Sequence, residues 1–497
     1  MTDQYEYEDQ KPGRISASEV MHNLAFACIL LNIVFSPWFF GSWEMWWFWP
    51  MAALIFAGCF FSGLGVLLSN VFNTNPDQWQ SLRDHFSASG GVVAVFLSYL
   101  PFLLYALLRR QFDSGEGLPL VAMEAERSLL LFITPTAICL VMFLSFTRRK
   151  LRLLISAFLA NAILIAIYAT VNQFFHNGDY VLWVLSEWDY GGRAKAVFFC
   201  PNHLSAYLNL AICLCTALLC APRTPLRARI AAAVMTVVLF IPDFLTLSRG
   251  GLASLALGLL IGISTLAMRG YSLRAKIIAP AVIILAVVAS VTIIVKTDNP
   301  LMARVKSHGL YNIAVKNYGT PEFTDKVIDG FWYSFDRGMY IQSALRAWKS
   351  NPVWGIGPGQ HPNRWQEFNP TDPGVRPVDG DPATMKRPRY VNNQQHLYEV
   401  HSDWTQLLEE YGVVGLALFL VGISTVVVVL FNAQTRANRG ENAHNLERSL
   451  PLAAQLACLV MAIHSLGDFS FQMPSITWTF AALVFAAILS VVETGKA

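Results

Sequence analysis

The sequence predicts an all-α integral membrane protein with about twelve transmembrane helices and one large polar loop. First, 54% of its 497 residues are hydrophobic and 14% are charged, with a mean hydropathy of +0.43, whereas soluble domains carry about 25% charged residues. Second, the chain contains apolar runs of about 20 residues, the length that crosses a hydrocarbon core. Third, these runs are too long and continuous for barrel strands, and only helices or closed barrels satisfy their backbone groups in lipid.

The expected spans follow one another with short connectors, except for one long gap. They cover residues 22–40, 46–68, 91–108, 128–146, 153–172, 198–220, 230–247, 250–268, 277–296, 404–431, 452–468 and 475–493. FGSWE joins the first two, and Gln455 and His464 make the eleventh the least apolar. An even number of spans places both termini on one side of the membrane.

Basic connectors predict the orientation, because Lys and Arg in short loops stay cytoplasmic. Four connectors are net positive and fall on one side, namely residues 147–152, 222–229, 269–276 and 432–448. The pair Arg109 and Arg110 departs from this bias. We expect a cytoplasmic tail (1–21), nine membrane helices (22–296), a periplasmic loop carrying the catalytic region (297–403), and three more helices with a short cytoplasmic end (404–497).

The net charge and the positions of the cysteines limit the partners and sites that the chain is expected to have. The net charge of +3 is small, and we expect no nucleic-acid partner. All eight cysteines lie in or beside apolar runs and form no C-x-x-C pair, so neither a disulfide framework nor a zinc site is indicated. The first residues are polar and acidic, unlike a cleaved signal peptide, so the first apolar run is expected to remain as an anchor.

The long polar loop, residues 297–403, contains one predicted helix and one glycine-rich turn. Met339, Leu345 and Trp348 have helical spacing within 336–350 and stop before Asn351-Pro352. The string NPVWGIGPGQ (351–360) follows, and we expect Gly355, Gly357 and Gly359 to form a flexible, exposed turn of a kind that binds anions. It lacks the Lys-Ser/Thr and the strand–helix context of a nucleotide loop. Residues 366–400 are rich in Pro, Asp and Asn and read as irregular chain.

Two arginines are candidate phosphate ligands. Arg249 stands in LSRGG between two spans, on the same side as the long loop. It can simply reach the lipid headgroups, or its planar, permanently charged guanidinium can clamp phosphate oxygens. Gly250 and Gly251 would allow close backbone approach. Arg337 follows Asp336 at the start of the predicted short helix, either as a surface pair or as a second clamp.

His401 is the candidate base. It opens HSDWTQLLEEYGVVG, which leads directly into a span. An interfacial histidine can be a headgroup contact, but its near-neutral pKa also suits general-base work. Asp403 is a possible orienting partner, which spacing alone cannot establish. Glu409 and Glu410 lie about two turns into the helix, where an acid is costly and often functional, and one of them is expected to face the loop or neighbouring helices.

Two further acidic patterns have weaker functional readings. Asp379-Gly-Asp381 resembles the D-x-D of metal-dependent glycosyltransferases, but it lies among prolines without a nucleotide-binding domain. His464 and Asp468, in HSLGDFSFQMPS (464–475), could line a site, although structural packing is the favoured interpretation.

Five segments in this order resemble the bacterial O-antigen ligase and polymerase superfamily over roughly residues 195–490. They are FFCPNHLSAYL (198–208), LSRGG (247–251), DRG to NPVWGIGPGQ (336–360), HSDWTQLLEEYGVVG (401–415) and HSLGDFSFQMP (464–474). The resemblance implies a GT-C-type helical bundle in a bacterial inner membrane, with the large periplasmic loop between the ninth and tenth spans.

The resemblance also implies a metal-independent, inverting glycosyltransferase without a cofactor. Its donor would be a glycan on undecaprenyl diphosphate. By this likeness, Arg249 and Arg337 hold the diphosphate, and His401 removes a proton from the acceptor hydroxyl at the periplasmic face. Asn202, Gly357 and Asp403 are further expected substrate-binding positions.

Several alternatives stay open from the sequence. The favoured acceptor is a lipid A–core sugar, as in a ligase, but a polymerase would use another lipid-linked repeat and a protein O-oligosaccharyltransferase a protein hydroxyl. A transporter of lipid-linked glycan would scatter polar residues through many spans, whereas Asn161, Asn172 and Asn209 are sparse. A scaffold subunit would not need the arginines or the histidine.

Overall fold

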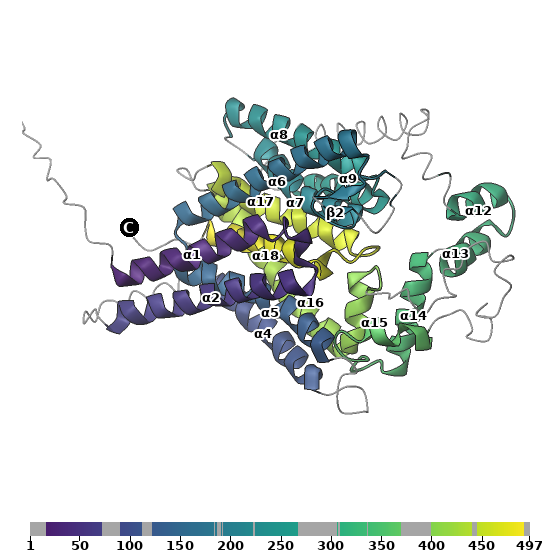
Figure 1. Ribbon diagram of the computed structural model, residues 1–497, viewed down its shortest axis with the longest axis horizontal. Coiled ribbons are helices and arrows are strands. Elements are labelled where there is room, and N and C mark those ends of the chain that lie inside the picture. Colours follow the sequence, from purple (N-terminus) through teal and green to yellow (C-terminus); the bar gives the residue numbers. More distant parts are fainter. Residues whose placement is uncertain are drawn as a thin grey trace, which may run out of the picture.

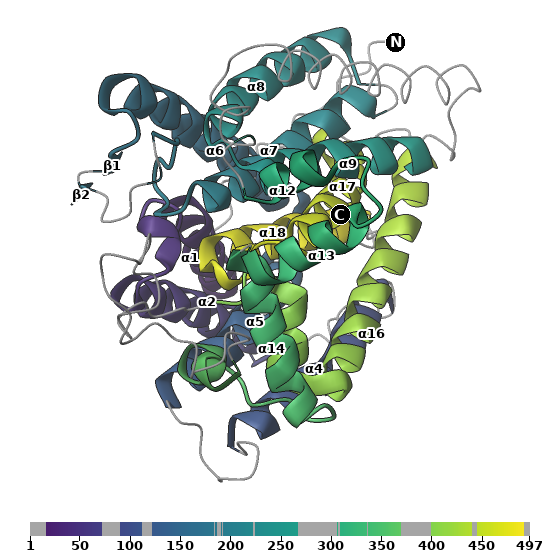
Figure 2. The ribbon, with the colours of Figure 1, turned by 90° about the vertical axis from the view of Figure 1, so that its right-hand side faces the viewer.

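The computed structural model consists almost entirely of helices that run side by side (Figures 1 and 2). It describes residues 16–71, 90–111, 122–182, 184–185, 190, 192–221, 224–266, 306, 309–334, 336–368, 399–439 and 445–491. Within these ranges the only strands are β1 (Tyr180–Val181) and β2 (Val184–Leu185), a short antiparallel pair.

Nine of the described helices are long and apolar enough to cross a membrane. They are α1 (Ala17–Phe35), α2 (Met45–Val71), α4 (Gly90–Gln111), α5 (Ala122–Ser145), α6 (Arg148–His176), α7 (Pro201–Cys220), α8 (Leu226–Leu245), α16 (Asp403–Arg439) and α17 (Asn445–His464). Two shorter apolar helices are α9 (Arg249–Leu266) and α18 (Pro474–Leu489).

These helices coincide, within several residues at each end, with every predicted span except 277–296, which lies outside the described residues. The all-α, multi-pass membrane class is confirmed. The total of twelve spans and the domain boundaries stay predictions.

Helix ends follow local sequence rules. The Ser16 hydroxyl accepts a hydrogen bond from the N–H of Glu19 and caps α1, and Thr147 caps α6 through the N–H of Lys150. Pro201 stands in the first turn of α7, where its missing N–H costs nothing. These signals fix where the helices begin, and packing decides which of them lie inside.

The centre of the bundle is formed by α7, α17 and α18. Nearly all side chains of α7 are buried, whereas α8 and α16 turn many apolar side chains outward. A helix that is apolar on every side belongs inside a bundle. The indole N–H of buried Trp478 on α18 donates to the Thr134 hydroxyl of α5 at 2.7 Å, a polar contact within this apolar core.

The long loop is largely helical where it is described. It contains α12 (Gly309–Asn317), α13 (Phe323–Ser334), α14 (Asp336–Ser350), α15 (His361–Arg364) and the 3₁₀ turn η2 (Trp365–Phe368), which gather at one end of the bundle (Figure 1). The helix predicted over 336–350 is confirmed as α14. Most of the stretch predicted to be irregular, residues 369–398, lies outside the described residues.

Helix α16 is broken at Gly412, whose φ is 65° and ψ is −172°. The glycine-rich segment of the loop docks into this break. The N–H of Ile356 donates to the carbonyl of Glu409 at 2.9 Å, and the N–H of Gly357 to that of Glu410 at 3.0 Å. The break would leave these carbonyls without a helical partner, and the loop backbone supplies one.

The expectation of an exposed, anion-binding turn at 355–359 is therefore wrong. Residues 355–358 are buried. The N–H groups of Ile356 and Gly357 are bonded to carbonyls of α16, and that of Gly355 to the carbonyl of Asn351. A Cβ on Gly355 would lie 2.4 Å from the carbonyl oxygen of Glu410, so the glycine is needed for close packing rather than for flexibility.

Candidate active site

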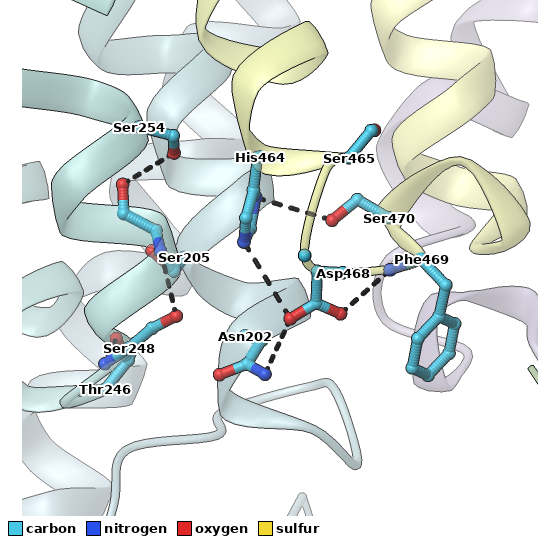
Figure 3. Close-up of polar contacts among 12 residues, drawn as sticks. Asn202, Ser205, Thr246, Ser248, Ser254, His464, Ser465, Asp468, Phe469 and Ser470 are labelled. Carbon is cyan, nitrogen blue, oxygen red and sulfur yellow. Dashed lines mark hydrogen bonds and ion pairs between the residues drawn. The ribbon is translucent and has the colours of Figure 1, made fainter. Parts of the chain in front are cut away.

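Asp468 is the centre of a buried polar cluster where the loop after α17 meets the start of α7. Its carboxylate is 1% exposed. Oδ2 accepts hydrogen bonds from the Asn202 amide at 2.7 Å and from Nη2 of Arg337 at 3.0 Å, and Oδ1 accepts from the N–H of Phe469 at 2.9 Å. Nε2 of His464 lies 3.9 Å from Oδ2. Figure 3 shows Asn202, His464 and the Phe469 backbone converging on this carboxylate.

Asp468 stays ionised at neutral pH. Burial is the largest single influence and would raise its pKa, but the positive charge of Arg337 and the nearby histidines together outweigh burial. The pKa of Asp468 is therefore lowered below its usual range. Arg337 is held at two points, because Nη1 also donates to the carbonyl of Gly467. The cluster thus fixes one edge of a guanidinium whose side chain is still 26% exposed.

A second arginine is joined to the same cluster through Asn202. Arg193, which is 3% exposed, donates through Nη2 to Oδ1 of Asn202 at 2.7 Å and through Nε to the carbonyl of Thr246 at 2.6 Å. Lys195 is also buried, and its Nζ lies 5.5 Å from the ring centroid of Tyr190. The amide oxygen and the amide nitrogen of Asn202 are thus both hydrogen-bonded. The structure places this expected substrate-binding residue between Arg193 and Asp468.

Arg249 begins α9 directly after the turn that contains Thr246. It is partly buried. A Cβ on the next residue, Gly250, would lie 3.7 Å from the His464 ring, which places the start of α9 beside the Asp468 cluster. A Cβ on Gly251 would lie 2.0 Å from the Ser205 hydroxyl, so the expected close backbone approach is observed there, against α7.

His401 is held by aromatic rings. Its backbone is left-handed, with φ 59°, a region that histidine enters more readily than most residues. The imidazole stacks on Tyr340 with centroids 5.5 Å apart and meets the edge of Phe469 at 4.6 Å. Its Nδ1 is buried and has no hydrogen-bond partner among the described residues. Desolvation, followed by the charge of Arg337, lowers the pKa of His401 well below 6.5, so the ring is neutral at pH 7.

The expected pairing of His401 with Asp403 is not observed. Oδ2 of Asp403 instead accepts from the Ser465 hydroxyl at 2.7 Å and from the N–H of Phe471 at 3.1 Å. Its own N–H donates to the carbonyl of Asp468 at 3.2 Å. Because α16 starts at Asp403, these bonds fasten the start of the helix to the loop that carries Asp468, and stacking rather than a carboxylate orients the imidazole.

Glu409 and Glu410 both face the loop. Nδ1 of His361 lies 2.8 Å from Oε2 of Glu409, and the N–H of Gly359 donates to Oε2 of Glu410 at 2.9 Å. The expected substrate-binding role of Gly357 does not fit this arrangement, because its N–H is already bonded to Glu410. The glycine segment positions α14 and α16 and is not itself an anion site.

The sequence does not single out Arg193 or Lys195, and for Asp468 it favours packing over lining a site. A histidine and an aspartate four residues apart at the end of a span are nevertheless a usable signal. Arg193 and Lys195 stand in GGRAKAV, two cations directly before an apolar helix. The D-x-D at 379–381 lies outside the described residues. Within the described residues, no group of three or more His, Cys, Asp or Glu side chains could hold a metal ion.

A comparison with known families supports the resemblance that the sequence motifs suggest for this region. Residues 232–420 match a family model described as O-antigen ligase. A comparison with curated proteins finds no matching sequence. The match includes Arg249, Arg337 and His401 and stops before Asp468. Residues 232–420, which run from α8 into α16, are thus similar to the O-antigen ligase family.

Proposed function

We propose that this protein transfers a glycan en bloc from undecaprenyl diphosphate to a hydroxyl group, with a lipid A–core sugar as the favoured acceptor. The family consists of membrane ligases and polymerases of the glycosyltransferase kind, which supports an enzyme. The observation that carries the finer proposal is the arrangement of Arg337 and His401 around Asp468. The proposed location is the periplasmic face of a bacterial inner membrane.

Cations would bind the diphosphate and stabilise it as it leaves. Two of the five N–H groups of Arg337 bind Asp468 and Gly467, and the others are available to phosphate oxygens. Arg249, Arg193 and Lys195 add positive charge around the same cluster. Fixed cations placed where negative charge develops are an effective way to lower such a barrier. This role requires no metal ion, and we propose a metal-independent reaction without a cofactor.

His401 would act as the general base. Its neutral imidazole takes the proton of the acceptor hydroxyl while the oxygen attacks the anomeric carbon of the donor. The bond from that carbon to the diphosphate oxygen breaks, and the electron pair leaves with the diphosphate. A single displacement of this kind inverts the anomeric centre.

A reconstituted transfer assay tests the proposal. With EDTA present, transfer from undecaprenyl diphosphate-linked glycan is compared for the wild type, Arg337→Ala and His401→Ala. Loss of a general base typically costs 10²–10⁴-fold and loss of one charge-stabilising donor about 10²–10³-fold. Arg346→Ala, on the exposed side of α14, and His176→Ala, exposed at the end of α6, are matched controls. Full transfer by both site variants would rule out the assigned site.

The acceptor panel separates the members of the superfamily. Lipid A–core, a second lipid-linked glycan and a peptide are offered to the wild type in parallel, because a ligase, a polymerase and a protein O-oligosaccharyltransferase would share the donor site. If no acceptor reacts but labelled lipid-linked glycan crosses liposome membranes, the protein is a transporter.

A further inference from the structure

A cavity of about 250 Å³ lies among α4, α5, α16, α17 and α18. Its walls are mostly apolar and include Phe96, Leu131, Phe132, Phe419, Phe480 and Phe485. Along α18 the lining extends from Thr477 to Ile488, which is about 16 Å of helix. The mechanism proposed above makes no use of this cavity, which has the elongated apolar form that suits a hydrocarbon chain.

One end of the cavity is polar. There it shares Ser128, Gln406, Glu410 and Gln472 with a smaller pocket that is also lined by Arg127 and Glu399. Arg127 is 6% exposed, and its Nε and Nη2 atoms have no hydrogen-bond partner among the described residues. The guanidinium stacks on Trp43, 4.0 Å from the ring centroid, and its Nη1 lies 3.8 Å from Oε2 of Glu124. Because buried donors are normally satisfied, the two remaining donors favour a bound polar group at this end.

The polar end differs chemically from the Asp468 cluster. Cations dominate around Asp468, whereas the cavity presents carboxyl and amide groups with one arginine. Burial raises the pKa of Glu399 to about 8, so this carboxyl group is neutral at pH 7 and can both donate and accept hydrogen bonds. Such a set suits sugar hydroxyls better than a diphosphate.

Asp403 connects the two places. It lines the cavity together with Ser465, and its carboxylate accepts a hydrogen bond from the Ser465 hydroxyl. Its backbone N–H donates a hydrogen bond to the carbonyl of Asp468. His401 is two residues away on the chain. A sugar held at the polar end of the cavity is therefore next to the segment that carries the proposed base.

We propose that this cavity binds the apolar chain of the acceptor, so that the acceptor is a sugar carried on a lipid and not a protein hydroxyl or a free saccharide. The proposal rests on the proposed function and names its acceptor class. Arg127 would donate to an oxygen of the acceptor sugar.

The test varies chain length and cavity size together. Acceptors with one sugar on a long or a short apolar chain, and donors with long or short chains, are compared in the wild type and in Ala481→Phe, which fills the cavity. Ala233→Phe on the outward face of α8 is the matched control. The wild type should prefer the long-chain acceptor by more than tenfold in kcat/KM, because each buried methylene strengthens binding about fourfold. Ala481→Phe should abolish this preference through KM and leave the dependence on donor chain length unchanged.

Two results would overturn the proposal. If Ala481→Phe changes the dependence on donor chain length instead, the cavity holds the donor chain. If the variant keeps the full preference for long-chain acceptors, the chain binds elsewhere. Arg337→Ala and His401→Ala in the same assay test the proposed function separately, since they should lose transfer to every acceptor.

A second measurement needs no variant. Cys139 and Cys458 line the cavity, whereas Cys220 does not. The long-chain acceptor should slow alkylation of Cys139 and Cys458 by N-ethylmaleimide at least about threefold and leave Cys220 unchanged, as measured by peptide mass spectrometry. Equal alkylation rates with and without acceptor would contradict the assignment, whether or not Ala481→Phe folds.

Discussion

His401 owes its chemistry to its surroundings. Three residues near the cluster have left-handed backbone without being glycine, namely Ala196, Leu247 and His401. Such conformations cost of order 1–3 kcal/mol each and persist where the surrounding structure enforces them, often at functional sites. At His401, Tyr340 and Phe469 enforce a ring position that is shielded from water and close to Arg337.

The pH dependence of transfer should report this environment. Because the pKa of His401 is lowered from 6.5, the base stays neutral as the pH falls, and kcat/KM should remain level from pH 7.5 to below pH 6.5. Tyr340→Leu lets water reach the ring and should move the acid limb upward, toward pH 6.5. The measurement is a pH profile of both proteins. A wild-type acid limb at or above pH 6.5 would contradict the lowered pKa.

Substitution of Asp468 should lower the rate of transfer, because its carboxylate holds Arg337 in position. Asp468→Asn keeps the shape but removes the charge that fixes Arg337, so the arginine loses its position. We expect a fall in kcat/KM of about 10²-fold, comparable with the loss of one charge-stabilising donor, with a raised KM for the donor.

Asp403→Asn is the matched control for Asp468→Asn, because it removes a carboxylate that bonds Ser465 and Phe471 but not Arg337. Its KM for the donor should be unchanged. An equal effect of the two substitutions on that KM would show that Asp468 acts through general stability alone.

At the scale of elements, the break in α16 joins the loop to the bundle. The segment before Gly412 carries Glu409 and Glu410, which bond the loop, and the segment after it continues through the membrane region. The backbone around Gly355 and the backbone around Gly412 pack so closely that neither position has room for a side chain. The docking of the loop therefore depends on paired glycines in two elements.

Gly412→Ala tests this dependence. A Cβ there would lie 2.3 Å from the carbonyl oxygen of Val353, and the φ of 65° adds strain. We expect destabilisation of about 2–4 kcal/mol, as for other substitutions that the native backbone cannot accept. Thermal unfolding in detergent measures it. Gly63→Ala in α2, where a Cβ would meet nothing within 4 Å, should be neutral or stabilising by up to about 1 kcal/mol. Similar effects at both positions would argue against the docked geometry.

At the scale of the whole molecule, the helices of the long loop gather at one end of the bundle (Figure 2 shows α12, α13 and α14 toward the viewer). The basic connector at 147–152 caps and begins α6, directly after the end of α5. The positive-inside bias predicts that this connector is cytoplasmic and that the loop faces the periplasm.

Cysteine labelling tests the predicted orientation. In a variant with the accessible native cysteines replaced, Tyr318→Cys on the loop should react with a membrane-impermeant maleimide in intact spheroplasts. Arg149→Cys, at a position that is also exposed, should react only after permeabilisation. The opposite pattern would invert the topology and place the proposed site in the cytoplasm.

The sequence by itself determined the local features of this protein. Hydrophobic runs of membrane length predicted every described span, because a helix in lipid must satisfy its own backbone and needs about 20 apolar residues to do so. The spacing of apolar residues and the Asn351-Pro352 stop predicted α14. Residue chemistry and motif order singled out Arg249, Arg337 and His401.

Only the tertiary structure decided which residues meet. Asp468 binds Arg337 and Asn202, which are 131 and 266 residues away in the chain, and no local pattern encodes such pairs. The sequence predicted an exposed glycine turn. In the structure the break in α16 offers carbonyl groups that accept hydrogen bonds from Ile356 and Gly357. The partner of Asp403 was likewise set by packing. Spacing along a chain fixes what a residue can do, whereas the contacts that select one role depend on how distant helices pack.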